Sequence, residues 1–548
     1  MAAAATVMLG GPADAAGAQV PGAAHIVVLR VGYDPGGVLF SHASFISRVA
    51  PGRAGGVALL AHVDRLDDVL DAAIADPALD VTIRDVGGPE ELAAALELER
   101  ETIDAGQLWT VTPGRSDLPH LGTVSLEAAA VEASSAVEDE VLALTSDSTR
   151  RDGVVVAEDL LPTMRSVAGL PEDGGGGAVI RPVRAALPVD LYERYVANRR
   201  MSVPIQTAAG LFVTGVGLLG VSLIAARDRV PSWATSVGAW LAIAVTPLGI
   251  SLLMAGHLET LTYASVLGVV IGGSALGCAA AAAVARRWGT VSALAALGAA
   301  TIALFVLEAA LGWTAASTTF LGGSQLDGGR FFGLPNVDIG LLLGAGVFVA
   351  HRAGGVWPGV AILAGITLFA GLPSVGANLG AAATFGAATG LWWGLLRERR
   401  SAWSIAVIAV AGAATAAALT LVASVALPGA PTHITDFAQG ESGSVAETVV
   451  RRLRVGFDLI ARNPFAIVPV IGVAAMVPAV LRPAEPIRAS FDRHPGWREA
   501  LLTILWGSVV AYVANDSGAS ALSMGFGTAL SGLVFVSLRD RPWKMGTS

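Results

Sequence analysis

The sequence predicts an α/β extracytoplasmic domain followed by an all-α polytopic membrane domain of about eleven transmembrane helices. Of the 548 residues, 53% are hydrophobic and only 14% are charged, whereas soluble globular proteins usually carry about 25% charged residues. The charges are also unevenly spread. Residues 1–203 contain 29 acidic and 15 basic side chains, and residues 204–548 contain 15 and 20. An acidic, water-soluble part therefore precedes a long apolar part.

The first 23 residues are alanine-rich and leave three interpretations open. Residues 2–10 are weakly apolar, and Ala13-Asp14-Ala15 is similar to a small-residue cleavage site. No lysine or arginine precedes Arg30, so the positive region of an export signal is missing. The segment 1–23 is predicted to be either a degenerate signal, or the remnant of one shortened by a misplaced start, or an alanine-rich disordered N-terminus.

Residues 24–186 alternate between strand and helix patterns and predict the extracytoplasmic α/β domain. Short runs of apolar or alternating residues indicate strands, and runs with apolar residues at helical spacing indicate helices. Such alternation favours a largely parallel sheet. The predicted strands are 25–31, 80–86 and 107–113, the predicted helices are 63–77 and 88–106, and 153–170 reads as strand, turn and helix.

The rest of the chain predicts a transmembrane helical domain over residues 204–537. A membrane-spanning helix needs about 20 mostly apolar residues. Gly and Ala are frequent within the runs, which suits close packing of helices. Two runs, 356–371 and 500–515, are short enough to be tilted helices or half-helices. The eleven candidates are 204–226, 233–255, 260–284, 289–311, 335–351, 356–371, 377–396, 402–427, 464–481, 500–515 and 518–537.

The orientation follows from the basic residues of the loops, because cytoplasmic loops carry an excess of Arg and Lys. Alternate loops contain 15 basic residues on one side and 5 on the other. The richer side is predicted to be cytoplasmic, which places the tail 538–548 inside the cell and the N-terminal domain outside the plasma membrane. Arg194, Arg199 and Arg200 oppose this assignment. They fall in the segment 187–203, which is predicted to be an interfacial linker.

Polar residues gather at the outer ends of the predicted spans. Glu308 lies about one turn from the end of the fourth span, and three Gly-rich polar loops follow at 321–340, 371–380 and 513–520. An ionisable residue inside a span is costly and by default indicates function. The candidate substrate-binding residues are Glu308, Asp327, Arg330, Asn336, Asp338, Asn378, Asn515, Asp516 and Ser517.

These residues predict a shared, outward-facing polar pocket. The planar guanidinium of Arg330 suits bidentate contact with a phosphate or carboxylate, and the carboxylates can bind a cation, accept protons or pair with Arg330. Ordinary turn chemistry also explains Asp-Gly-Gly and Asn-Asp-Ser-Gly sequences. Glu308 is the strongest single candidate, because turn chemistry does not explain a carboxylate within a span.

Two stretches resemble known families. VVVAEDLLPTMRSVAGL with the following AVIRPV resembles the C-terminal end of alkaline-phosphatase/sulfatase-type domains. LPVDLYERYVANRR and the motifs RFFGLPN, GANLG and NDSG resemble an uncharacterised family of bacterial multi-pass membrane proteins, common in GC-rich Gram-positive bacteria. The resemblance implies a reduced phosphatase-like domain outside the cell joined to a helical membrane domain. Pro335, and Asn378 where that family carries Asp, depart from its motifs.

The resemblance does not imply a working phosphatase. That superfamily needs a nucleophile and several Asp and His ligands for metals, whereas residues 1–203 contain only His25, His42, His62 and His120. None of these has a ligand-like spacing beyond His62 with Asp64. We therefore predict no metal, no cofactor and no identified catalytic residue. A degenerate domain can act as a lid, a recognition module or a surface for envelope-protein partners.

Three functions stay open from the sequence. The first is a transporter-like protein that binds or translocates an anionic cell-envelope precursor, with lipid-linked precursors as one class. The second is a membrane-surface transferase or polymerase acting on a polyprenyl-phosphate-linked substrate, and the third is a non-catalytic scaffold with a pseudo-phosphatase domain. Membrane lipids are expected partners, for example of a basic helix at 446–464, which the pattern predicts either as an interfacial helix or as a plain packing helix. Nucleic acid is excluded as a partner, since no basic patch with interleaved aromatic residues occurs.

Overall fold

The structure is a computed structural model. It describes residues 25–31, 55–61, 66–86, 106–112, 121–128, 142–149, 154–168, 177–183, 189–313, 318–321, 332–397, 401–426, 467–515 and 518–539, with a few isolated positions between them. The chain divides into two compact units. The first comprises residues 1–144 and 156–184, and the second residues 145–155 and 185–548.

The first unit is built on a mixed β-sheet. The strands follow the order β3-β1-β4-β5-β2-β6-β8, with β7 paired to β2. The described strands are β1 (His25–Val31), β2 (Gly55–Ala61), β3 (Asp80–Val86), β4 (Gly106–Thr112), β5 (Leu121–Ala128), β6 (Leu142–Thr145), β7 (Val154–Val156) and β8 (Arg181–Val183).

The prediction of a largely parallel sheet is only partly right. β1 pairs in parallel with both β3 and β4, as the alternation of strands and helices favours. β5, however, runs antiparallel to both of its neighbours, β4 and β2. β2 and β5 were not among the predicted strands. The sequence pattern therefore indicated strands in one part of the sheet and missed the antiparallel strand beside them.

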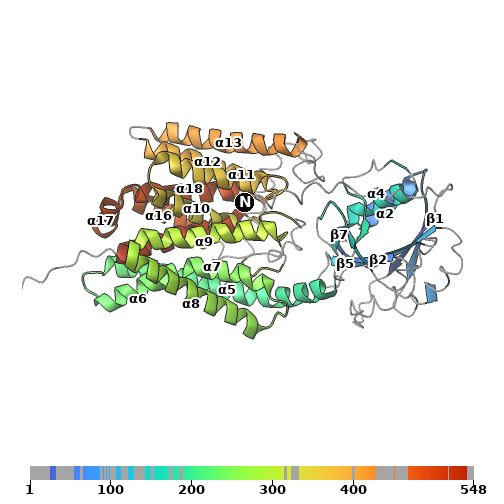
Figure 1. Cartoon of the computed structure of the whole chain (residues 1–548), viewed down its shortest axis with the longest axis horizontal. Helices are drawn as coiled ribbons and strands as arrows, with labels where there is room; N and C mark the ends of the chain where they lie inside the picture. Colours follow the sequence, from blue (N-terminus) through green and yellow to red (C-terminus); the bar gives the residue numbers. More distant parts are fainter. Residues whose placement is uncertain are drawn as a thin grey trace, which may run out of the picture. The chain divides into compact units, whose positions relative to one another are not determined.

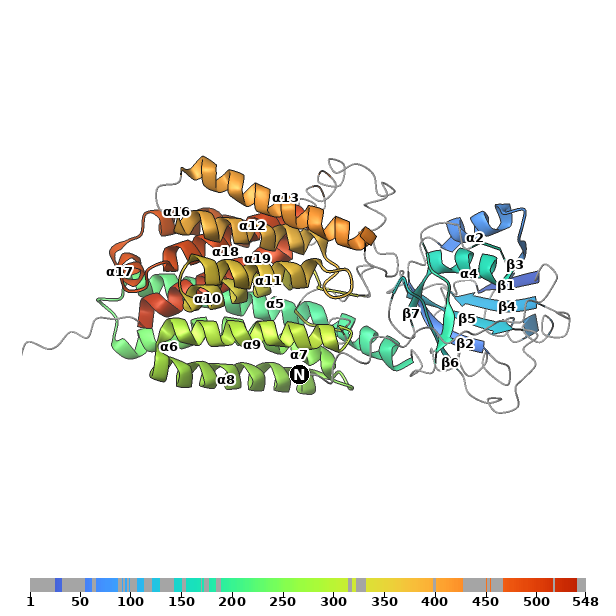
Figure 2. The same cartoon turned by 45° about the horizontal axis from the view of Figure 1, so that its top comes forward.

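Two helices pack together on one side of this sheet (Figure 2). They are α2 (Leu66–Ala75) and α4 (Leu160–Val167), and an ion pair between Arg165 and Asp76 joins them. Leu70 and Leu160 are almost fully buried. The sheet and these helices thus share an apolar core of the kind that the sequence predicts. The predicted helix 88–106 and the predicted signal 1–23 lie largely or wholly outside the described residues.

The Asp-x-x-Pro-Thr sequence at the start of α4 holds two loops in place. The buried carboxylate of Asp159 accepts hydrogen bonds from the backbone N–H of Val156 (3.0 Å) and of Ala178 (2.8 Å). The hydroxyl of Thr163 accepts one from the N–H of Ile180 (2.9 Å) and donates to the carbonyl oxygen of Asp159 (2.5 Å). This motif, which resembles one in phosphatase-type domains, therefore has a structural role, since it holds residues 178–180 against α4.

Replacing Asp159 with alanine is expected to destabilise the first unit by about 2–4 kcal/mol, because it leaves two backbone N–H groups without their acceptor. Asp71→Ala, at an exposed position of α2, is the matched control and is expected to change stability by less than about 0.5 kcal/mol. The measurement is made on the full-length, detergent-solubilised chain. It is the urea concentration at which the first unit becomes sensitive to protease. Equal midpoints for the two variants would contradict the role given to Asp159.

The second unit is a bundle of helices that run side by side (Figure 1). Its described helices are α5 (Val189–Ala225), α6 (Ser232–Ile243), α7 (Val245–Met254), the short η3 (Ala255–His257), α8 (Tyr263–Trp288), α9 (Thr290–Ala310), α10 (Ile339–Ala353), α11 (Val356–Gly371), α12 (Leu379–Leu396), α13 (Ala402–Ala426), α16 (Ile467–Leu481), α17 (Glu485–Arg493), α18 (Trp497–Ala514) and α19 (Gly518–Arg539).

All eleven segments predicted as spans contain a helix. Seven of the described helical segments are long and apolar enough to cross a membrane, and the count becomes eight if α16 and α17, bent by 68°, form one span. The helices α10 and α11 are apolar but shorter. The chain is thus a multi-pass membrane protein by its helices, while the number of eleven spans stays a prediction. The predicted linker 187–203 is helical from residue 189 and continues into the first span without a break.

The bundle has inner and outer helices. Nearly every residue of α10 and most of α19 are buried, whereas α8 and α13 expose large apolar side chains such as Leu276 and Val410. An apolar surface of this kind suits contact with lipid. Glycines let the helices approach closely, as the sequence predicts. A Cβ added to Gly386 of α12, for example, would lie only 2.4 Å from the carbonyl oxygen of Gly412 in α13.

The long helix α5 defines the two ends of the bundle. Arg194, near its start, donates a hydrogen bond to the carbonyl oxygen of Gly256 in η3, and Arg227, just after its end, pairs with Glu485 of α17. We call the first of these the Arg194 end and the second the Arg227 end. The helix α17 lies across the Arg227 end (Figure 1). The predicted interfacial helix at 446–464 lies almost entirely outside the described residues.

Candidate functional site

A buried carboxylate marks the Arg194 end. Glu308 lies in the last turn of α9, its side chain is fully buried, and its Oε1 contacts Nε2 of His257. The side chain of His257 is 29% exposed, so the imidazole connects a buried carboxylate with the surface of the bundle. The helix α7 ends in the η3 turn, and this turn carries His257 to the end of α9. The sequence thus correctly placed Glu308 near the end of a helix but did not pair it with His257.

A second buried carboxylate lies near the first. Asp338 immediately precedes α10 and is only 1% exposed. Among the described residues, neither of its carboxylate oxygens has a hydrogen-bond partner. Asp338 and Glu308 interact electrostatically, although they come from different helices. A buried carboxylate without hydrogen bonds is unusual, because desolvation makes its charged form costly.

The loop before α12 forms a third part of the site. Asn378 is fully buried and caps α12, because its Oδ1 accepts a hydrogen bond from the N–H of Ala381 (2.9 Å). Its side-chain amide donates to the carbonyl oxygen of Leu334 (2.8 Å) and to Oδ1 of Asn336 (3.0 Å). The N–H of Leu334 donates in turn to the carbonyl oxygen of Gly376 (2.7 Å). Asn378 therefore ties together the loops before α10 and α12.

Trp313 connects this loop to the end of α9. Its backbone N–H donates to the carbonyl oxygen of Glu308 (2.8 Å), and its indole Nε1 donates to the carbonyl oxygen of Val375 (2.9 Å). Trp313 is fully buried and has a positive φ of 62°. Such a backbone conformation is strained for a bulky residue. The contacts of Trp313 therefore hold Glu308 at a defined place relative to the 371–380 loop.

The end of α18 meets the start of α12 at the same site. A Cβ added at Gly380 would lie 2.2 Å from Oδ1 of Asn515 and 2.5 Å from the carbonyl oxygen of Ala514. The amide of Asn515 donates to the carbonyl oxygen of Ala511 (3.0 Å), within α18. The glycine of the GANLG motif thus permits a close approach of two helix ends, and Asn515 lies at that contact.

The beginning of α5 is fastened to the same end. Besides Gly256, Arg194 contacts Oγ1 of Thr318 (3.2 Å), and the amide of Asn198 donates to the carbonyl oxygen of Thr318 (2.7 Å). Arg194 is one of the three basic residues that oppose the predicted orientation. Its guanidinium has a structural role in the bundle, which gives a reason for a basic residue at this end.

Four of the nine predicted site residues lie outside the described residues: Asp327, Arg330, Asp516 and Ser517. The other five, Glu308, Asn336, Asp338, Asn378 and Asn515, lie at the Arg194 end of the bundle, in buried or half-buried positions. Trp313 and Asn198 were not among the residues predicted from the sequence. For His257 the only signal was a histidine directly after an apolar run, which also suits an ordinary turn.

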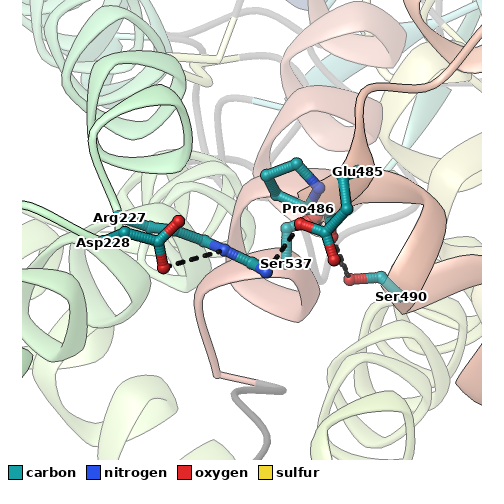
Figure 3. Close-up of polar contacts among 6 residues, drawn as sticks. All are labelled: Arg227, Asp228, Glu485, Pro486, Ser490 and Ser537. Carbon is teal, nitrogen blue, oxygen red and sulfur yellow. Dashed lines mark hydrogen bonds and ion pairs between the residues drawn. The ribbon is translucent and has the colours of Figure 1, made fainter.

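The Arg227 end differs in character. Here Arg227 pairs with Glu485 (2.9 Å) and Asp228 (3.9 Å), and the hydroxyls of Ser490 and Ser537 lie 3.5 Å apart (Figure 3). The carboxylates of Glu485 and Asp228 are largely exposed. Exposed ion pairs contribute little, typically about 0–1 kcal/mol. This end therefore supplies matched control positions for the buried carboxylates of the site.

The fold and the site together define a multi-pass membrane protein with buried carboxyl and amide groups at one end of its helical bundle. Within the described residues, no group of three or more His, Cys, Asp or Glu side chains is placed to hold a metal ion. Comparisons with protein-family models, with curated proteins and with solved structures found no match to the chain.

Proposed function

We propose that this protein binds or translocates an anionic cell-envelope precursor at the Arg194 end of its bundle. The observation that carries a functional site at this end is the convergence of Glu308, Asp338 and Asn378, which come from three separate helix ends and are all buried. Buried ionisable groups in a membrane bundle are costly unless they serve a function. The anionic character of the ligand is taken from Arg330 of the sequence, whose guanidinium suits a phosphate or carboxylate.

The orientation and the cellular place belong to the same proposal. With the Arg194 end outside the plasma membrane, the basic ends of α8, α10 and α19, at Arg287, Arg352 and Arg539, face the cytoplasm, as the rule for basic residues requires. The full set of eleven spans and a reduced, alkaline-phosphatase-like domain at the N-terminus are parts of this proposal too. They rest on the hydropathy of the short helices and on the resemblance of residues 154–183.

The test is a thermal-shift measurement on the purified full-length chain with a polyprenyl phosphate, the corresponding polyprenol, and inorganic phosphate. A ligand at 100 times its Kd adds about 2.7 kcal/mol of stability, so the polyprenyl phosphate is expected to raise the melting temperature of the wild type by several degrees. Stabilisation by inorganic phosphate alone would indicate a free anion as the ligand. Arg330→Ala and Glu308→Gln are expected to lose the shift.

The matched control is Glu485→Gln, which makes the same change as Glu308→Gln at the Arg227 end and is expected to respond to ligand as the wild type does. The proposal is wrong if neither the polyprenyl phosphate nor inorganic phosphate stabilises the wild type, or if the uncharged polyprenol stabilises it as much as the polyprenyl phosphate does. It is also wrong if both site variants keep the full shift.

A scaffold is the second candidate function, and the bonding of Asp159 favours it. Both carboxylate oxygens of Asp159 are used to hold backbone N–H groups, so the motif that resembles phosphatases serves the architecture of the first unit. A domain kept for its shape suits recruitment of envelope proteins. This function takes the lead if the ligand screen is negative and the full-length chain instead captures a stable protein partner through unit 1.

A further inference from the structure

We propose that Glu308 and Asp338 form a proton-binding pair that holds one exchangeable proton, with His257 as its connection to solvent. The inference rests on the proposed function in one respect: the proton is assigned as the ion whose binding is coupled to transport. The proton itself can be tested without any ligand.

The first argument is the environment of Asp338. It is 1% exposed, and no described group donates a hydrogen bond to either carboxylate oxygen. Charged carboxylates in such positions usually accept several hydrogen bonds or pair with a cation. The neutral acid form avoids the desolvation cost of the buried charge. Binding of one proton converts the carboxylate into this form.

The second argument is the neighbouring carboxylate. Glu308 is 0% exposed and interacts electrostatically with Asp338. Two like charges at one buried site repel each other, and a single proton on either group relieves the repulsion.

The third argument is a path to solvent. His257 contacts Glu308 directly and is 29% exposed, in contrast to the fully buried Glu308. Imidazole takes up and releases protons near neutral pH. When Nδ1 of His257 binds a proton from solvent, the proton on Nε2 can pass to Oε1 of Glu308 and thus reach the pair, and the imidazole returns to its neutral form.

Other described titratable groups lie on the elements around the pair. Arg194 bonds to Gly256 and Thr318. Glu259 and Tyr263 lie near the start of α8, and Tyr512 lies near the end of α18. The remaining titratable groups on the helices packed around α9 and α10 lie in mid-helix or towards the Arg227 end: Cys278, Arg286, Arg287, His351, Arg352, Arg498, Glu499 and Arg539.

The direct test is infrared difference spectroscopy of the full-length protein without ligand, across mildly acidic to mildly alkaline pH. A C=O stretching band of a protonated carboxylic acid is expected at neutral pH, sensitive to transfer into D₂O. Asp338→Asn or Glu308→Gln is expected to remove it, and the exposed-site control Asp228→Asn to retain it. His257→Gln is expected to keep the band but to slow its exchange in D₂O severalfold.

A second readout is the melting temperature as a function of pH. A carboxyl that keeps its proton more tightly in the folded state contributes stability that is present at low pH and lost as pH rises. Wild type is therefore expected to lose several degrees towards alkaline pH relative to Asp338→Asn, in which the position is always neutral. Asp228→Asn is expected to follow the wild type.

Three results would overturn the proposal. The first is an absent acid band in the wild type, and the second is a band that survives in both site variants. The third is a band that disappears when choline chloride is replaced by sodium chloride at constant pH, which would make the pair a sodium site. If Asp338→Asn does not fold, the spectra of the wild type and of Glu308→Gln still test the proposal. If the acid band is present but no probe shifts the melting temperature, this inference holds and the proposed function is wrong.

Discussion

Replacing Gly340 with alanine is expected to lower the yield of folded protein sharply, because the added methyl group has no room. Its Cβ would lie 2.1 Å from the carbonyl oxygen of Ala521 and 2.5 Å from the backbone nitrogen of Gly525. Backbone atoms of α19 cannot move aside as a flexible side chain can, so α10 and α19 must separate. Overpacking of this kind costs typically about 1–3 kcal/mol and occasionally more, and we expect the upper part of that range.

The measurement is the monodisperse fraction after detergent extraction, together with the melting temperature of that fraction. Gly268→Ala is the matched control, since it makes the same change within α8 and a Cβ there meets nothing within 4 Å. The control is expected to match the wild type or to be slightly more stable, because alanine favours helix more than glycine does. A Gly340→Ala protein as stable as the control would show that the two helices are not in the described contact.

Replacing Asn378 with aspartate is expected to destabilise the second unit, although aspartate is the residue that the resembling family carries there. The side-chain amide donates two hydrogen bonds, to Leu334 and to Asn336. A carboxylate can still cap α12 but cannot donate, and it would face two oxygen atoms in a buried position. Unsatisfied buried polar groups cost about 1–3 kcal/mol each, so the melting temperature should fall by several degrees.

Asn378→Ser separates the two roles of this residue. Serine is also a good N-cap but is too short to reach both Leu334 and Asn336, so its expected loss is smaller than that of aspartate. A further check is pH, because protonation of the new carboxyl restores one donor and should recover part of the stability under acidic conditions. An aspartate variant that melts with the wild type at every pH would disprove the donor role of Asn378.

Much of the architecture could be predicted because the decisive signals are local. Each apolar run is contained within one segment, and all eleven runs contain a helix. The break between α6 and α7, by contrast, was not predicted, and neither were β2 and β5. Whether a seven-residue run such as Gly55–Ala61 forms a strand depends on pairing with partners that lie elsewhere in the chain, such as β5.

The division into an acidic α/β part and an apolar helical part, and the helix-end position of Glu308, follow from local sequence patterns. The partners of the site residues do not. His257 and Glu308 are 51 residues apart, and Asn336 and Asn378 are 42 apart. Hydropathy sets where a helix begins and ends, but contacts across helices depend on how each helix is rotated and packed against its neighbours. That packing brings Glu308 and Asp338 to the same end of the bundle and leaves the carboxylate of Asp338 without a hydrogen-bond partner among the described residues.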